Sequence, residues 1–90
     1  MPAIMMISHE VKDFAAWKPG FDAHAPAREA AGIKVVFVTQ DASNPNLVHG
    51  VMEAASADVF QKFLSAPGMA EAMEKGGVIG RPDTRIGTTV

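Results

Sequence analysis

Residues 34–54 read KVVFVTQDASNPNLVHGVMEA, and this stretch decides the fold. Residues 34–40 are rich in β-branched side chains, which favour extended strands. Residues 41–46 combine Asp, Ser, Pro and Asn, which is the composition of a turn. Residues 47–54 return to mostly apolar side chains, so the sequence predicts two antiparallel strands joined as a hairpin.

A helical pattern precedes the hairpin. Asp13 is a good N-cap, and apolar side chains then recur at three- and four-residue spacing, at Phe14, Trp17, Phe21 and Ala25. Pro19-Gly20 and Pro26 interrupt this pattern, because proline inside a helix removes a hydrogen bond. We therefore expect a kinked or segmented helix that ends at Ala31-Gly32.

A second helical pattern follows the hairpin. Ser56 caps it, and its apolar face consists of Val59, Phe60, Phe63 and Leu64. Pro67-Gly68 breaks this helix, which continues for a further turn or two and stops at Gly76-Gly77.

A strand is expected at each end of the chain. Residues 3–9, AIMMISH, are apolar at nearly every position, and residues 84–90 form the most polar strand. The order strand, helix, strand, strand, helix, strand is the ferredoxin-like βαββαβ arrangement. The fold class is therefore α+β, a four-stranded antiparallel sheet with helices on one face and strands one and three in the centre. Residues 1–90 are expected to form a single domain.

The two central strands carry apolar side chains on both faces. Residues 4–7 run without a polar break, whereas a strand with one wet face alternates. Something must cover the open face, and a second copy packing sheet against sheet is the simplest cover. The sequence therefore predicts a homodimer.

Composition excludes several classes of function. The net charge of −2 and the absence of a basic run argue against nucleic-acid binding. The apolar runs are too short to span a bilayer and no basic membrane helix is visible, so no membrane association is expected. The chain has no cysteine, which excludes disulfides and thiolate chemistry. No signal peptide is visible, and the expected location is cytoplasmic.

Short motifs along most of the chain resemble small bacterial proteins of the dimeric α/β-barrel superfamily. They are Val11-Lys12-Asp13-Phe14, Trp17-Lys18-Pro19, Phe21-Asp22, Ala31-Gly32, Asn44-Pro45-Asn46, Ser65-Ala66-Pro67 and Gly76-Gly77-Val78. That superfamily includes antibiotic-biosynthesis monooxygenases, haem-degrading monooxygenases, muconolactone isomerases and proteins labelled as cyclases. The resemblance implies a dimer with a pocket between sheet and helices in each subunit.

The sequence departs from the enzymatic members of that superfamily. The cofactor-independent and haem-degrading monooxygenases among them tend to use an Asn on the first strand and a Trp on the second helix. Here the first strand has Ser8 and His9, the second helix has Phe60 and Phe63, and the chain has no Tyr. Those roles therefore do not carry over.

The candidate site lies where the strands end. Strands one and three are antiparallel neighbours, so a plausible register pairs His9 with His49, and the last strand brings Arg85 nearby. Trp17, in the helix that follows His9, and Phe37, at the centre of the second strand, complete a substrate-binding set with Arg85. Imidazoles transfer protons near neutral pH, so His9 and His49 are the candidate catalytic residues. A slip of one residue in the register would put the two histidines on opposite faces of the sheet. The alternative is that each histidine is an ordinary strand-end residue without a catalytic role.

Other polar residues carry less information. His24 is expected to be a partly exposed helix residue remote from this end. No carboxylate lies at a convincing ligand spacing, so neither a metal nor another cofactor is expected. The methionines provide core packing or a soft pocket lining, and these are Met5, Met6, Met52, Met69 and Met73.

Two functions remain open from the sequence. The first is a dimer that binds a small apolar or aromatic molecule. The resemblance implies cofactor-independent oxygenation, isomerisation or cyclisation of an aromatic or polyketide-like compound, with His9 as the acid/base group assisted by His49 and Arg85. The alternative is a non-catalytic ligand-binding or structural dimer. A cavity with converging polar groups favours the first, and one filled by Met and Phe side chains favours the second.

Overall fold

The structure, a computed structural model, describes residues 2–66 and 68–90. The expected order of strands and helices is confirmed, with both helical regions divided in two. The elements are β1 (Ala3–Val11), α1 (Phe14–Ala23), α2 (Ala25–Ala30), β2 (Lys34–Gln40), β3 (Leu47–Ala54), α3 (Ala57–Leu64), α4 (Met69–Lys75) and β4 (Val78–Thr88).

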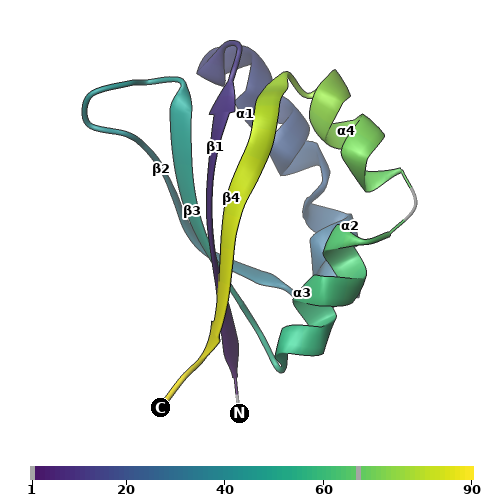
Figure 1. The fold of residues 1–90 in the computed structure, drawn as a ribbon. Helices are drawn as coiled ribbons and strands as arrows, with labels where there is room; N and C mark the ends of the chain where they lie inside the picture. The colour runs from purple at the N-terminus through teal and green to yellow at the C-terminus, as the bar shows by residue number, and fades with distance from the viewer. Residues whose placement is uncertain (1, 67) are drawn as a thin grey trace.

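The strands form one antiparallel sheet in the order β2-β3-β1-β4. β1 and β3 therefore occupy the centre, as the sequence predicts. All the helices lie on one side of the sheet, to the right of the strands in Figure 1. The α+β, ferredoxin-like fold class is confirmed.

The first helical region divides at His24, whereas α1 runs without a break through Pro19-Gly20, so the interruption predicted there is wrong. The Asp13 carboxylate accepts a hydrogen bond from the Ala15 N–H at 3.2 Å and so starts α1. His24 is both the C-cap of α1 and the N-cap of α2. Pro26 lies in the first turn of α2. Backbone N–H groups there have no acceptor within the helix, so the missing N–H of proline costs no helical hydrogen bond. Gly32, with φ +83°, follows the end of α2, as expected for a C-terminal glycine.

The second helical region is divided as the sequence predicts. Ser56 occupies the N-cap of α3, although its side chain makes no capping hydrogen bond within the described chain. Gly68, with φ +85°, precedes α4, whereas Pro67, the other half of the expected break, lies outside the described residues. Gly77, with φ +89°, follows α4 and lets the chain turn back towards the sheet.

The last strand is longer than expected, since it begins at Val78 instead of Thr84. Its pairing with β1 shifts between Ser8 and Glu10, and Gly80 on the shifted segment has φ +70°. A bulge of this kind bends a strand without ending it. Residues 76–80 therefore both end α4 and begin β4, whereas the sequence predicts only the end of the helix there.

Side chains on the helix face of the sheet form the core. Phe60 of α3 is fully buried and belongs to a cluster with Ala3, Met5, Ile33, Met52 and Ala54. Trp17 forms a second cluster with Val11 and Val48, against which Phe14 and Phe21 pack. The apolar stripe predicted for the first helix therefore does face the sheet, although Phe21 is only partly buried.

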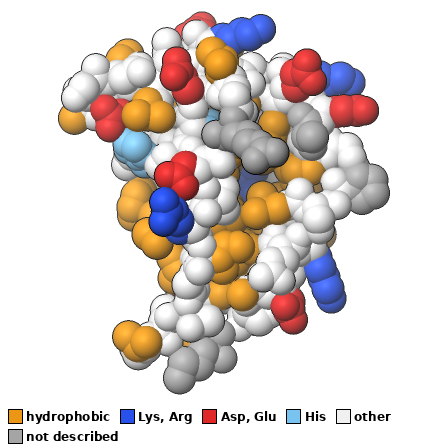
Figure 2. All heavy atoms as spheres, viewed as in Figure 1, with side chains coloured by type: hydrophobic (Ala, Val, Ile, Leu, Met, Phe, Trp, Pro, Cys, Tyr) orange, Lys and Arg blue, Asp and Glu red, His pale blue; other side chains and the backbone are white. Residues whose placement is uncertain are grey.

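The other face of the sheet has no helix over it among the described residues. Three large apolar side chains on it are about half exposed, Met6 on β1, Phe37 on β2 and Ile79 on β4. Figure 2 shows hydrophobic side chains gathered over the strands at the left of the molecule. Exposed apolar side chains on neighbouring strands are typical of an association surface.

Candidate functional site

A cavity of about 490 Å³ lies between the sheet and the helices. In Figure 2 hydrophobic side chains surround the hollow between β4 and the helices. Its apolar wall includes Met5, Ile7, Trp17, Phe21, Val48, Met52, Phe63, Leu64, Met69 and Met73. This size is within the range of small-molecule sites, and the methionines make an adaptable lining.

His9 is the polar group of β1 that borders this cavity. Side chains alternate along a strand, so His9 shares the helix face with Met5 and Ile7, and only 8% of its surface is exposed. Neither ring nitrogen has a hydrogen-bond partner among the residues that the structure describes. Burial lowers the pKa of His9 from its usual value, so the imidazole is neutral at pH 7. A neutral imidazole can accept a proton or donate one hydrogen bond.

Arg28 of α2 also lines the cavity, and only 6% of its surface is exposed. Its guanidinium carbon lies over the ring of Phe21, 3.9 Å from the ring centroid. Phe21 stacks in turn on Trp17, with centroids 4.9 Å apart. Burial lowers the pKa of Arg28, whereas the charges of Asp22 and Glu29 raise it. An arginine remains charged under these conditions, so the cavity has a fixed cation.

His49 does not share the cavity with His9, and that expectation is wrong. His9 pairs with Val48 across the sheet, and His49 pairs with Ser8. This register is one residue away from the pairing expected from the sequence, and one residue is enough to move a side chain to the other face. His49 therefore lies on the open face, with its side chain 39% exposed.

Arg85 and Phe37 lie on the open face as well. Arg85 pairs with Met6 and Phe37 pairs with Val51, and both of these partners face away from the helices. The Arg85 guanidinium contacts the Asp83 carboxylate at 3.2 Å in an exposed ion pair. The expectation that Arg85 lies beside His9 and Trp17 is therefore also wrong. Among the described residues, Arg28 is the arginine that lines the cavity.

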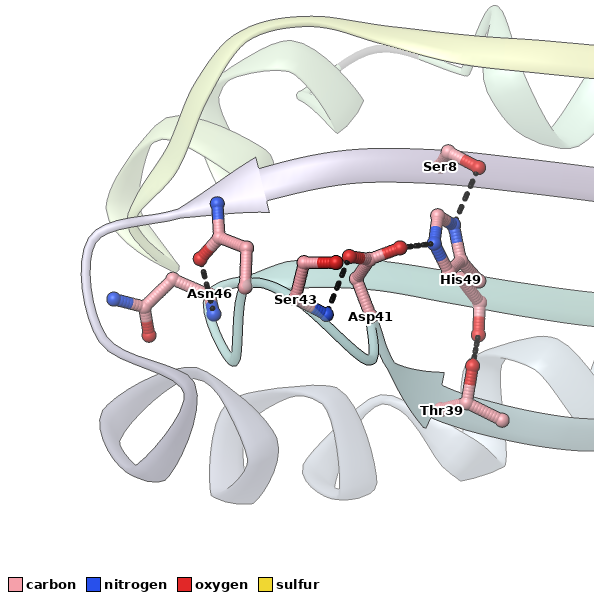
Figure 3. Close-up of polar contacts among 7 residues, drawn as sticks. Ser8, Thr39, Asp41, Ser43, Asn46 and His49 are labelled. Carbon is pink, nitrogen blue, oxygen red and sulfur yellow. Dashed lines mark hydrogen bonds and ion pairs between the residues drawn. The ribbon is translucent and has the colours of Figure 1, made fainter.

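His49 joins Ser8 and Asp41 in a chain of hydrogen bonds (Figure 3). His49 Nδ1 lies 2.8 Å from Ser8 Oγ, and His49 Nε2 lies 2.8 Å from Asp41 Oδ1. The hydrogen bond from His49, followed by that from the Ser43 N–H, lowers the pKa of Asp41. These side chains line neither the cavity between sheet and helices nor the hollow beside Lys18, Asp22 and Glu29. The trio is therefore not part of the cavity that holds His9, and its hydrogen bonds fix polar side chains on the open face.

The helical spacing of the sequence also points to Arg28, which was not among the candidate residues placed at the strand ends. Arg28 lies seven residues after Phe21, so it continues the helical stripe of Trp17 and Phe21 into α2. A charged residue on an apolar helical stripe is a candidate for a buried residue with a role in binding or catalysis. His24 lies on the same stripe and also lines the cavity, although it is an exposed residue as expected.

No group of three or more potential metal-ligating side chains occurs within residues 2–66 and 68–90. In the same part of the chain, no helix has the length and apolar character needed to cross a bilayer.

Comparison with known proteins connects this architecture to solved structures. No protein-family model matches the chain, and no curated protein sequence matches it. A proposed antibiotic biosynthesis monooxygenase from Bordetella bronchiseptica superposes with a TM-score of 0.81 at 16% identity, over 99% of this chain and 97% of that one. A second, from Caulobacter crescentus, gives a TM-score of 0.75 at 16% identity, over 99% and 90%.

SnoaB, a cofactor-independent oxygenase from Streptomyces nogalater, gives a TM-score of 0.68 at 15% identity, over 98% of this chain and 92% of that one. At these identities the likeness is one of fold. The chain has the ferredoxin-like fold of the antibiotic-biosynthesis-monooxygenase-like proteins, and the resemblance found in its motifs is confirmed at that level.

Proposed function

We propose that this protein binds a flat, mostly apolar molecule in the cavity and acts on it without a cofactor, with His9 as the acid/base group. The observation that carries the proposal is a buried imidazole, without a described hydrogen-bond partner, at the wall of an apolar cavity of about 490 Å³. A site with few polar groups in an apolar lining is the usual form of a small-molecule site.

The chemistry follows from the state of His9. Because burial lowers its pKa, the imidazole is unprotonated at neutral pH and can take a proton from a bound carbon acid or phenol. The resulting anion is delocalised over the aromatic system and can react with dioxygen or accept the proton at another atom. Oxygenation and isomerisation therefore share this first step. The known activity of SnoaB, a cofactor-independent oxygenase of the same fold, favours oxygenation.

The same site also supports the alternative of a ligand-binding protein without turnover. An open cavity favours both functions over a purely structural dimer, which would fill the space with side chains. Separate measurements of binding and turnover therefore distinguish the two functions.

Anthrone, a tricyclic ketone with an acidic methylene group, is a suitable probe. Trp17 is the one tryptophan of the chain and lines the cavity, so quenching of its fluorescence reports binding. Uptake of one dioxygen per anthrone, with formation of anthraquinone and water, reports turnover. His9→Phe is expected to retain quenching and lose the catalysed oxygen uptake. His49→Gln, on the other face, is the matched control and is expected to retain both.

Quenching without catalysed uptake in the parent protein would favour the ligand-binding alternative. Equal uptake by the parent and His9→Phe would exclude His9 as the acid/base group.

We also infer that two copies associate through the open face of the sheet. Met6, Phe37 and Ile79 supply exposed apolar surface there, and a stable dimer needs about 1,200–2,000 Å² in total. The Ser8, His49 and Asp41 side chains lie on the same face with their hydrogen bonds already made, so covering them leaves fewer polar groups unpaired.

A further inference from the structure

We propose that Arg28 recognises an anionic group of the ligand, so that the preferred ligand is an aromatic carboxylate or carries an equally acidic oxygen. This inference rests on the proposed use of the cavity as a ligand site and specifies the chemistry of what enters it.

The first support is a largely buried arginine that forms no direct ion pair among the described residues. Arg28 is 6% exposed, and buried arginines are normally paired with a carboxylate. Among the described residues, none of the ion pairs within 4.0 Å involves Arg28, and no hydrogen bond from its guanidinium occurs. Its described partner is the face of Phe21. A ring face attracts a cation but accepts no N–H hydrogen bond of full strength, so the donors at the edge of the guanidinium remain available.

The carboxylates nearest in sequence do not take this role. The two oxygens of Asp22 contact Lys18 Nζ at 2.7 and 2.9 Å on the outside of α1. Glu29 follows Arg28 directly, and neighbouring helical residues point in different directions, with Glu29 exposed. Asp22 and Glu29 therefore act on Arg28 through their charges without a described ion pair to it, and an anion entering the cavity would be the first direct partner.

The second support is the order of side chains along the cavity wall. Trp17 contacts both His9 and Phe21, and the Arg28 guanidinium lies over the ring of Phe21. The proton acceptor and the cation are thus separated by two aromatic rings. A ligand that reaches both has its acidic group at one end of a flat body and its reacting proton at the other. A carboxylate suits the Arg28 end because a guanidinium can bind both of its oxygens.

The remaining charged groups of the lining are consistent with this assignment. Lys75 of α4 adds positive charge, and Glu71 is the acidic residue among the described lining side chains. Glu71 and Lys75 are exposed, so water screens their charges, whereas Arg28 is only 6% exposed and its charge is screened less.

The test compares two probes of the same shape, 6-hydroxy-2-naphthoic acid and its neutral amide, by titration calorimetry on the full-length protein at pH 7. The acid is expected to bind at least about ten-fold more tightly than the amide. Arg28→Met is expected to lose at least about ten-fold affinity for the acid and to bind the amide as the parent does. Arg28→Lys, which keeps the charge but not the planar fork, is expected to be intermediate. Lys62→Met, which removes an exposed cation outside the cavity, is the matched control and is expected to bind both probes unchanged.

Thermal unfolding separates recognition from a structural role. Replacing an unpaired buried charge with an apolar side chain of similar length is expected to leave the ligand-free melting temperature unchanged or higher. An Arg28→Met protein that melts several degrees lower would show that the guanidinium stabilises the fold, and the proposal would be wrong.

Equal affinity of the parent for acid and amide would overturn the role of Arg28 and leave the proposed function intact. Failure of both probes to bind would overturn both.

Discussion

The imidazole of His9 meets the indole of Trp17 at an angle of 66°, with ring centroids 5.2 Å apart. This edge-to-face contact holds the imidazole against the cavity wall without supplying a hydrogen bond to its nitrogens. Trp17 thereby fixes the position of the imidazole that we propose as the proton acceptor, and both of its ring nitrogens remain without a described hydrogen-bond partner.

The burial of His9 predicts a pH dependence of stability. Its pKa is lowered in the folded state from 6.5, so below that pH the unfolded chain binds more protons than the folded chain. The free energy of unfolding is therefore expected to decrease as the pH falls below about 6.5, by up to about 1.4 kcal/mol per pH unit, until the folded pKa is reached. Urea titrations of the parent and His9→Phe between about pH 5 and pH 8 measure this, and the variant is expected to lack this part of the slope. Identical slopes would contradict the prediction.

Asp41 is expected to titrate at lower pH than an ordinary aspartate. The hydrogen bond from His49 lowers its pKa from 3.8, so this contribution to stability is present above that pH and is lost as the pH falls through the folded pKa. Carboxyl NMR titration is expected to give a midpoint below 3.8 in the parent and a higher midpoint in His49→Gln. His24→Gln serves as the control, since His24 lies on the helix side of the sheet. An unchanged Asp41 midpoint in His49→Gln would show that the hydrogen bond does not persist in solution.

Met6→Lys is expected to dissociate the proposed dimer. Met6 is half exposed at the centre of the open face, and a two-fold axis would bring two copies of the new charge to the same interface. Sedimentation velocity at micromolar concentration is expected to give a dimer for the parent and a monomer for the variant. Ala15→Lys, on the exposed side of α1, is the control and is expected to remain dimeric. A parent protein that sediments as a monomer would refute the association.

Phe60→Ala is expected to reduce the free energy of unfolding by about 3–5 kcal/mol, because this ring is fully buried and its loss leaves a cavity. Val36→Ala, at a half-exposed site on β2, is the control and is expected to cost less than about 1 kcal/mol. Urea denaturation followed by circular dichroism measures both. A loss below about 1 kcal/mol for Phe60→Ala would mean that the core is centred elsewhere.

The sequence predicts the order of the elements well because each carries a local signal. Asp13 and Gly32 mark the two ends of the first helical region, and the turn at residues 41–46 fixes the hairpin. It predicts the pairing of β1 with β3 less well. β1 is apolar on both faces, so its hydrophobic pattern does not decide which of two registers forms.

That ambiguity accounts for the errors in the candidate site. One residue of register moves His49 to the open face, and the position of Arg85 follows from its pairing with Met6. The helical spacing places Arg28 on the same stripe as Phe21. Its burial, however, depends on packing against Phe21 and the sheet together, and no local sequence pattern predicts that packing.

β1 separates two chemically different surfaces by a single backbone. Its alternate residues face the cavity, as His9 does, while those between them face the open side, as Met6 and Ser8 do. Under the proposed functions, a substitution at a cavity-facing position of β1 is expected to alter ligand preference, and one at an open-face position is expected to alter self-association. Gaining or losing one residue within the strand would exchange the two sets of side chains at once.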